Sequence, residues 1–135
     1  MNKILIDTMH IVSLLINENN SYYELSQALD DEKITGVVSV VTLTELIKIL
    51  GEKIYMEKIN ELVSLNIIVA DIDQTIAIRA GELRMRYGLP TGDSLIAATG
   101  LIENVKHILT DDAHFNAVKN LIKPIKLNTA LKMVR

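Results

Sequence analysis

The sequence has no cysteine and no tryptophan, and only two prolines among its 135 residues. The absence of cysteine excludes disulfides, thiolate metal sites and cysteine nucleophiles, and it is consistent with a reducing compartment such as the cytoplasm. Positive charge is also scarce, since 14 Lys and Arg stand against 17 Asp and Glu and the formal net charge is −3. No overall basic field attracts nucleic acid, so any contact with it must depend on a local patch or on a metal ion.

Long hydrophobic runs are missing as well. No stretch approaches the ~20 apolar residues that a membrane span needs. The first apolar run stops at Asp7, where a signal peptide would continue. We therefore expect neither a signal peptide nor a membrane partner. Hydrophobic residues still make up 49% of the chain, which argues against disorder, and 135 residues predict one domain with a sizeable core.

The chain does contain a regular alternation of short apolar runs with helical patterns. The apolar runs predict strands at residues 3–6, 37–40, 67–70, 107–109 and 125–127. Helical spacing and capping residues predict helices at residues 8–16, 21–31, 42–50, 53–65, 74–87, 92–103 and 112–122. Such an alternation is typical of the α/β class, with a central parallel sheet of four to five short strands between helical layers.

Two boundaries complete this prediction. The domain is expected to cover residues 1–128, and the structure of the tail over residues 129–135 is left open. The first predicted helix is expected to end at the polar run of residues 17–20.

The positions of the carboxylates are the main functional signal. Asp7 ends the first predicted strand, and Asp111 and Asp112 follow the fourth. In an open parallel sheet, chemistry collects in the crevice outside the carboxyl ends of the strands. Glu45 and Asp93 stand in apolar surroundings near the starts of predicted helices, where an acid is costly unless it is paired, hydrogen-bonded or metal-bound. A group of acids without a matching basic group indicates a divalent cation.

Each of these acids also has a structural alternative. Asp7 could cap the helix that begins near Thr8. Glu45 follows Thr42 at the spacing of a capping box. A helix dipole stabilises an acid such as Asp93 in its first turn. The alternatives stay open at this point, because a first-turn carboxylate can keep free oxygens for a metal ion.

The neighbouring acids Asp111 and Asp112 must diverge, because adjacent side chains of extended chain point in opposite directions. One is expected to face the site while the other caps the following helix. The histidines lack the spacing of a metal motif such as H-E-x-x-H, so a structural or surface role is expected for His10, His107 and His114.

Taken in order, these motifs resemble those of PIN domains, and most closely the small VapC-like ribonuclease toxins of toxin–antitoxin pairs. The resemblance spans roughly residues 3–127. Its most specific stretches are Leu89-Pro90-Thr91-Gly92-Asp93-Ser94-Leu95-Ile96-Ala97-Ala98-Thr99 and Leu109-Thr110-Asp111-Asp112-Ala113-His114-Phe115. The resemblance implies metal-binding and catalytic roles for Asp7, Glu45, Asp93 and Asp112. It favours Asp112 over Asp111, because the family pattern is Thr-x-Asp followed by two residues and Phe.

The resemblance implies a three-layer α/β/α fold and an endoribonuclease that cleaves single-stranded RNA with Mg²⁺, or with Mn²⁺ in its place. Hydroxyls and a neighbouring acid would orient the ligands or a water, and these residues are Thr8, Ser94, Thr110 and Asp111. The implied partners are RNA, an antitoxin protein and a second copy of the chain. The antitoxin would lie in an apolar groove between the helices around residues 22–31 and 43–50.

Some residues favour alternatives to an active ribonuclease. Met9 stands where the family has a small polar residue, which leaves open a catalytically weak PIN-fold module that binds RNA or another protein. Met9 also occupies the second Asp position of an Asp-x-Asp phosphatase motif, which disfavours an aspartyl-phosphate protein. Lys48, Arg84 and Arg86 are candidates for RNA phosphates, although a solvated helix face explains them equally well.

Overall fold

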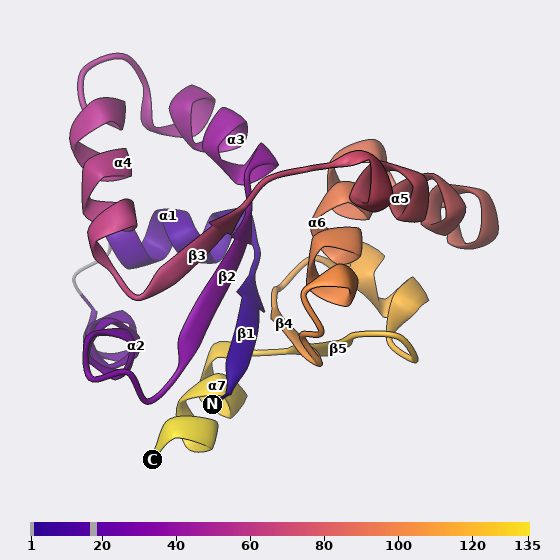
Figure 1. The fold of residues 1–135 in the computed structure, drawn as a ribbon. Helices are drawn as coiled ribbons and strands as arrows, with labels where there is room; N and C mark the ends of the chain where they lie inside the picture. Colours follow the sequence, from indigo (N-terminus) through magenta and orange to yellow (C-terminus); the bar gives the residue numbers. More distant parts are fainter. Residues whose placement is uncertain (1, 17–18) are drawn as a thin grey trace.

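The computed structural model describes residues 2–16 and 19–135 (Figure 1). Within these residues one sheet of five strands has the order β3-β2-β1-β4-β5, and every neighbouring pair is parallel. The strands are β1 (Lys3–Ile6), β2 (Thr35–Ser39), β3 (Ile67–Ala70), β4 (His107–Leu109) and β5 (Lys123–Ile125). The predicted α/β class and parallel sheet are confirmed.

Helices cover both faces of the sheet (Figure 1). They are α1 (Thr8–Ile16), α2 (Asn20–Asp30), α3 (Val41–Leu50), α4 (Tyr55–Ser64), α5 (Gln74–Tyr87), α6 (Thr91–Ile102), the 3₁₀ helix η1 (Ala113–Val118) and α7 (Leu127–Val134). Helices α1 to α4 and α7 pack on one face, whereas α5, α6 and η1 pack on the other. The predicted three-layer α/β/α arrangement is confirmed.

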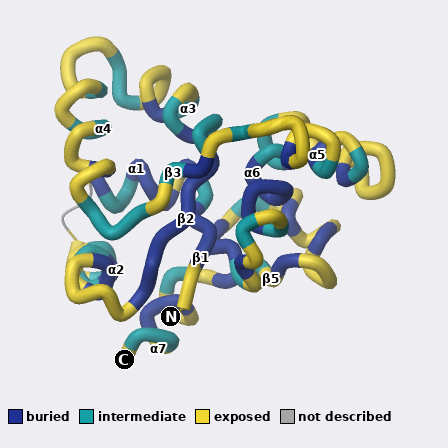
Figure 2. The backbone as a smooth tube through the Cα atoms, in the orientation of Figure 1, coloured by how far each residue is buried: buried dark blue, intermediate teal, exposed yellow. Residues whose placement is uncertain are grey.

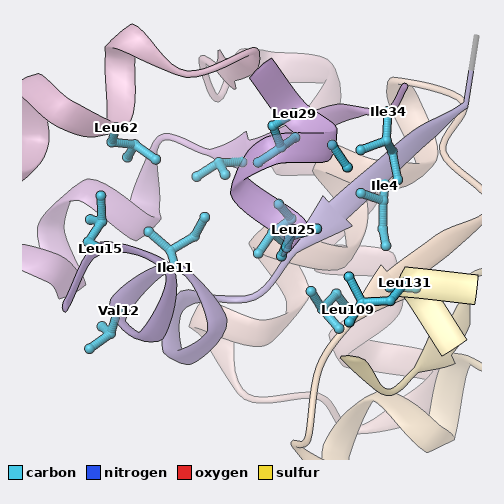
Figure 3. Close-up of a cluster of buried hydrophobic side chains, with 14 of the residues drawn as sticks. Ile4, Ile11, Val12, Leu15, Leu25, Leu29, Ile34, Leu62, Leu109 and Leu131 are labelled. Carbon is cyan, nitrogen blue, oxygen red and sulfur yellow. The ribbon is translucent and has the colours of Figure 1, made fainter. Parts of the chain in front are cut away.

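Strand β1 shows why the sheet needs both layers. Ile4 and Ile6 belong to one core cluster and Leu5 to the other, because side chains alternate across a strand. Figure 3 shows part of the first cluster, where Ile4 lies among side chains of the helices and of β4. Strand β2 is buried along its whole length (Figure 2). Parallel strands covered on both faces read as continuous apolar runs, which is the pattern that identified them.

Some element boundaries differ from prediction. The N-cap of α2 is Asn19, whose side chain accepts a hydrogen bond from the Tyr22 N–H at 3.2 Å, so α2 begins one residue before the predicted start at residue 21. Strand β2 begins at Thr35, earlier than predicted, because Thr35 and Gly36 pair with Lys3 and Ile4 of β1. The predicted end of α1 at residues 17 and 18 lies outside the described residues.

The C-terminal region differs most. The predicted helix over residues 112–122 is the short 3₁₀ helix η1, and the last strand covers Lys123–Ile125 where residues 125–127 were predicted. An edge strand tolerates Pro124 because only one side of it needs backbone donors. The segment left open beyond residue 128 continues helix α7, which buries Ala130 and Leu131 in the first core cluster. No helix among the described residues is long and apolar enough to cross a membrane.

The strand order creates a crevice next to β1. The chain passes from β1 to β2 on one side, and only later returns to place β4 on the other. At such a switch point the loops leave the carboxyl ends of the two central strands in opposite directions, and a crevice opens between them. The residues that follow β1 and β4 therefore face each other across this crevice.

Candidate active site

A cavity of ≈ 360 Å³ lies at this edge of the sheet, and its lining comes from β1, β4 and the helices beside them. The lining residues are Asp7, Thr8, Met9, Glu45, Asp93, Asp111 and Asp112. The convergence of four predicted acids in one pocket is therefore confirmed, while their roles stay a prediction. Met9 contributes an apolar side chain to the rim and is 59% exposed.

Asp7 occupies the centre of the crevice. Its N–H donates to the carbonyl of Leu109 at 3.0 Å, which ties the end of β1 to the end of β4. Its Oδ2 accepts from the hydroxyl of Thr110 at 2.7 Å, and its Oδ1 accepts from the N–H of Thr8 at 2.8 Å. Two donors thus orient the carboxylate, and each oxygen retains a lone pair that a cation could use.

Glu45 reaches the pocket from α3. Its Oε1 accepts from the hydroxyl of Thr8 at 2.5 Å, and that hydroxyl lies 3.1 Å from the hydroxyl of Thr42. Helix α3 starts earlier than predicted, with Val40 as its N-cap and no side-chain cap bond among the described residues. The capping-box alternative for Glu45 is therefore wrong, because Thr42 does not occupy the cap and the carboxylate is directed to Thr8.

Asp93 and Asp112 meet across the pocket through His114. The His114 Nδ1 lies 2.9 Å from Asp93 Oδ2 and 3.1 Å from Asp112 Oδ1. One ligand atom from each of the three side chains lies within 4.8 Å of the others, which is close enough for all three to hold one ion. Sequence reasoning expected only a structural or surface role for His114, and its position two residues after Asp112 was the signal that it missed.

Asp112 also has the structural role considered for this pair of acids. Its Oδ1 accepts from the N–H of His114 at 2.9 Å, so it is the N-cap of η1. Asp112 can cap η1 and still serve the pocket, because its Oδ2 stays available for a metal ion. Ser94, by contrast, is fully buried and donates its hydroxyl to the carbonyl of Thr91 at 2.7 Å.

The electrostatics of the pocket favour a cation. Burial raises the pKa of Asp93 to about 6, and the negative charges of Asp112 and Asp7 add to the rise, while the hydrogen bond from His114 opposes it. A carboxyl group with a raised pKa is held where its charged form lacks compensation. A divalent cation would supply that compensation, and carboxylate oxygens are the donors that Mg²⁺ prefers. The residues present therefore fit a hard metal ion.

Asp111 lines the same pocket but is engaged elsewhere. Its Oδ1 lies 3.3 Å from Lys126 Nζ, and its Oδ2 lies 3.1 Å from His10 Nε2. Lys126 reaches Asp111 because β5 lies beside β4, a neighbourhood that the sequence alone does not reveal. The basic residues that sequence analysis singled out, Lys48, Arg84 and Arg86, are exposed on α3 and α5 and do not line the pocket.

Comparisons with known proteins agree with this architecture. Three similar solved structures are VapBC2 of Rickettsia felis bound to a promoter DNA fragment, DNA-bound VapBC of Salmonella typhimurium and the sarcin–ricin loop cleaving toxin VapC20 of Mycobacterium tuberculosis. The Rickettsia protein is 22% identical with a TM-score of 0.75, and the match covers 92% of this chain and 98% of that one.

For the Salmonella protein the identity is 18%, the TM-score 0.73 and the coverage 94% and 99%. For the Mycobacterium toxin the identity is 15%, the TM-score 0.66 and the coverage 89% and 97%. At such identities the likeness is one of fold. No curated protein sequence matches the chain. The family profile described as PIN domain matches residues 4–121. The chain, with its parallel sheet and strand-end acids, therefore belongs to the PIN domain family.

Proposed function

We propose that this protein is a metal-dependent endoribonuclease that hydrolyses phosphodiester bonds of single-stranded RNA, and that it acts as the toxin of a toxin–antitoxin pair. The observation that carries the proposal is the convergence of Asp7, Glu45, Asp93 and Asp112 in one pocket at the carboxyl edge of the sheet. Family membership supports a nuclease, and the similar VapC20 structure, described as a loop-cleaving toxin, supports RNA as the substrate.

The four acids would hold Mg²⁺, with Mn²⁺ as a substitute, and His114 is a further candidate ligand that suits Mn²⁺ better than Mg²⁺. When bound, such an ion lowers the pKa of a coordinated water and stabilises negative charge on phosphate. The chain itself orients the ligands. Thr8 bonds to Glu45 and Thr110 bonds to Asp7, so both hydroxyls hold carboxylates in place before any ion arrives.

RNA phosphates need positive charge near an otherwise acidic pocket. Lys126 is 68% exposed at the rim, where it lies beside Asp111. Lys48 is exposed on α3, one turn beyond Glu45. We propose that these two lysines contact the RNA backbone beside the cleaved bond. Arg84 and Arg86 lie in the last turn of α5, which extends away from the β1–β3 half of the molecule (Figure 1).

An antitoxin partner is supported by the similar structures, which include VapBC complexes from several bacteria. Helices α2 and α3 each pack against α1, and only some of the apolar residues predicted to line a groove between α2 and α3 are available to such a partner. Leu46 is fully buried, and Tyr22 and Leu50 pack against the core. The exposed apolar side chains that remain are Tyr23, Ile47 and Ile49. We propose that this exposed subset contacts the antitoxin, in a cytoplasmic complex.

The test is cleavage of a fluorescent single-stranded RNA with Mg²⁺, with Mn²⁺ and with EDTA. We expect cleavage with either ion, none with EDTA, and a loss of at least about 100-fold in Asp7→Asn, which removes one charge from the pocket. Asp71→Asn is the matched control, because Asp71 is exposed after β3 at the same edge but does not line the pocket. Cleavage in EDTA or in Asp7→Asn would contradict the metal mechanism, and no cleavage by the wild-type protein with either ion would favour the RNA-binding module.

A further inference from the structure

A buried histidine lies directly behind the acidic pocket. His10, on α1, is only 3% exposed. Its Nδ1 lies 2.9 Å from the hydroxyl of Tyr22 on α2, and its Nε2 lies 3.1 Å from Asp111 Oδ2. Burial lowers the pKa of His10 although the nearby Asp111 and Asp7 oppose this, so the imidazole is neutral near pH 7. A buried imidazole is costly unless both of its nitrogens find partners.

The partners determine the tautomer. A carboxylate can only accept hydrogen bonds, so the proton of the neutral ring belongs on Nε2, which faces Asp111, and Nδ1 accepts from the hydroxyl of Tyr22. The Nε2 and Oδ2 atoms are close but not aligned as a hydrogen bond, and Nε2 has no other partner among the described atoms. Asp111 is thus the acceptor within reach of this buried donor.

Asp111 connects three parts of the fold. One oxygen faces His10 on α1, and the other lies 3.3 Å from Lys126 at the start of α7. Of its two neighbours, Asp112 lines the pocket and Thr110 holds Asp7. The Thr110 hydroxyl donates to Asp7 and accepts from the N–H of Asp112 at 3.0 Å. A loop of three residues therefore carries both a candidate metal ligand and the hydroxyl that orients another.

We propose that His10 and Asp111 form a positioning pair that holds this loop so that Asp112, rather than Asp111, is presented to the metal. The physical reason is the divergence of adjacent side chains: when His10 and Lys126 hold Asp111 on one side of the chain, Asp112 is left on the side of Asp93. The inference rests on the metal site proposed above. His10 touches neither metal nor RNA and acts only through Asp111.

The test compares Mn²⁺ affinity, measured by calorimetry, in the wild-type protein and in four variants, which are His10→Leu, His10→Gln, Asp111→Asn and the double variant of His10 and Asp111. His10→Leu removes the donor without changing the charge of the neutral ring, and we expect Mn²⁺ to bind about 10-fold more weakly, as for other residues that orient metal ligands. His10→Gln offers an amide N–H in place of Nε2 and should bind within about 3-fold of wild type. The double variant His10→Leu/Asp111→Asn should lose no more than the larger single loss, because the two residues act as one unit.

The same variants are compared without metal by hydrogen exchange. We expect the Asp112 N–H, which bonds to Thr110, to exchange about 10-fold faster in His10→Leu and near the wild-type rate in His10→Gln. Asp71→Asn controls for a lost charge at the same edge of the sheet and should leave this rate unchanged.

The outcomes separate the two proposals. If the wild-type protein binds no Mn²⁺, the metal site is wrong, yet the exchange rates still decide whether His10 holds the loop. Equal Mn²⁺ affinity and equal Asp112 exchange in wild type and His10→Leu would overturn the positioning role while the metal site stands. A His10→Leu variant that does not fold is replaced by His10→Gln and Asp111→Asn. In that case weak binding by His10→Gln, or unchanged exchange in Asp111→Asn, would overturn the role as well.

Discussion

At the scale of single residues, Asp93 combines a functional benefit with a structural cost. Its pKa is raised by burial and by neighbouring acids, so its charge destabilises the metal-free fold. We predict that Asp93→Asn abolishes RNA cleavage and raises the thermal midpoint of the metal-free protein. Solvent screening at this partly exposed group limits the gain to about 1 kcal/mol, or about 3–5 °C. Calorimetry in EDTA measures the shift, and a lower midpoint in the variant would contradict the argument.

The same carboxyl group predicts a dependence of stability on pH. The pKa of Asp93 is about 6 in the folded protein and 3.8 ordinarily, so the folded state binds more protons between these values. The stability that a protonated Asp93 gives to the folded state is fully present below about pH 4 and is lost as pH rises through about 6. Urea unfolding in EDTA from pH 4 to 7 would measure this. We expect the stability advantage of Asp93→Asn to grow over that range, and a constant difference would contradict the assignment.

At the scale of elements, the sequence predicts what local patterns determine. Helix α5 covers Gln74–Tyr87 as predicted, because Asp73 caps its start and Gly88 adopts φ 69° at its end. Lys126 lies at the site because β5 lies beside β4, and His114 meets Asp93 because η1 packs against α6. The spacing of two residues pairs His114 with Asp112, but no spacing along the chain encodes its contact with Asp93 or the contact of Lys126 with Asp111.

Contacts between residues distant in sequence also explain why the capping box at Glu45 was wrong and why the structure of residues 129–135 was not predicted. The capping box at Glu45 satisfied a local rule, but the contact with Thr8, distant in sequence, determined where the side chain lies. Helix α7 was left open because its buried residues, Ala130 and Leu131, are too few to show a pattern without the core that receives them. Local rules therefore gave the framework of the pocket, and tertiary contacts decided which side chains complete it.

The close packing of helix α6 against the sheet can be tested at Gly100. A Cβ at Gly100 would lie 2.7 Å from Ile122 Cδ1 and 2.8 Å from Leu5 Cδ2, both in the close-packed second core cluster. We predict that Gly100→Ala destabilises the fold by about 1–3 kcal/mol. Gly81→Ala on α5 is the matched control, because a Cβ there meets nothing within 4 Å, and it should stabilise by about 1 kcal/mol. Urea unfolding that ranks both variants alike would disprove close packing at Gly100.

At the scale of the whole molecule, the charges are divided between function and surface. The pocket gathers acids at one edge of the sheet, while lysines begin the strands at the other, with Lys3 on β1 and Lys123 on β5. A net charge of −3 therefore does not describe either edge. An acidic protein can therefore bind RNA through a cation and a few lysines beside the acids, such as Lys126 next to Asp111.

We predict that exposed apolar side chains hold two copies of the chain together as a homodimer. Several large apolar side chains are exposed, among them Ile78 at 62% and Met85 at 75%, which lie two turns apart on one face of α5. Contiguous apolar surface on a small protein marks contacts with other chains, and the chain is expected to pair with a second copy. Light scattering at micromolar concentration should give twice the 15.1 kDa chain mass. The mass should persist in about 0.5 M NaCl, because salt screens charge contacts but not apolar ones. A mass of one chain in low salt would exclude the homodimer, and a mass that falls by half in high salt would assign the contact to the opposed charges of the two edges.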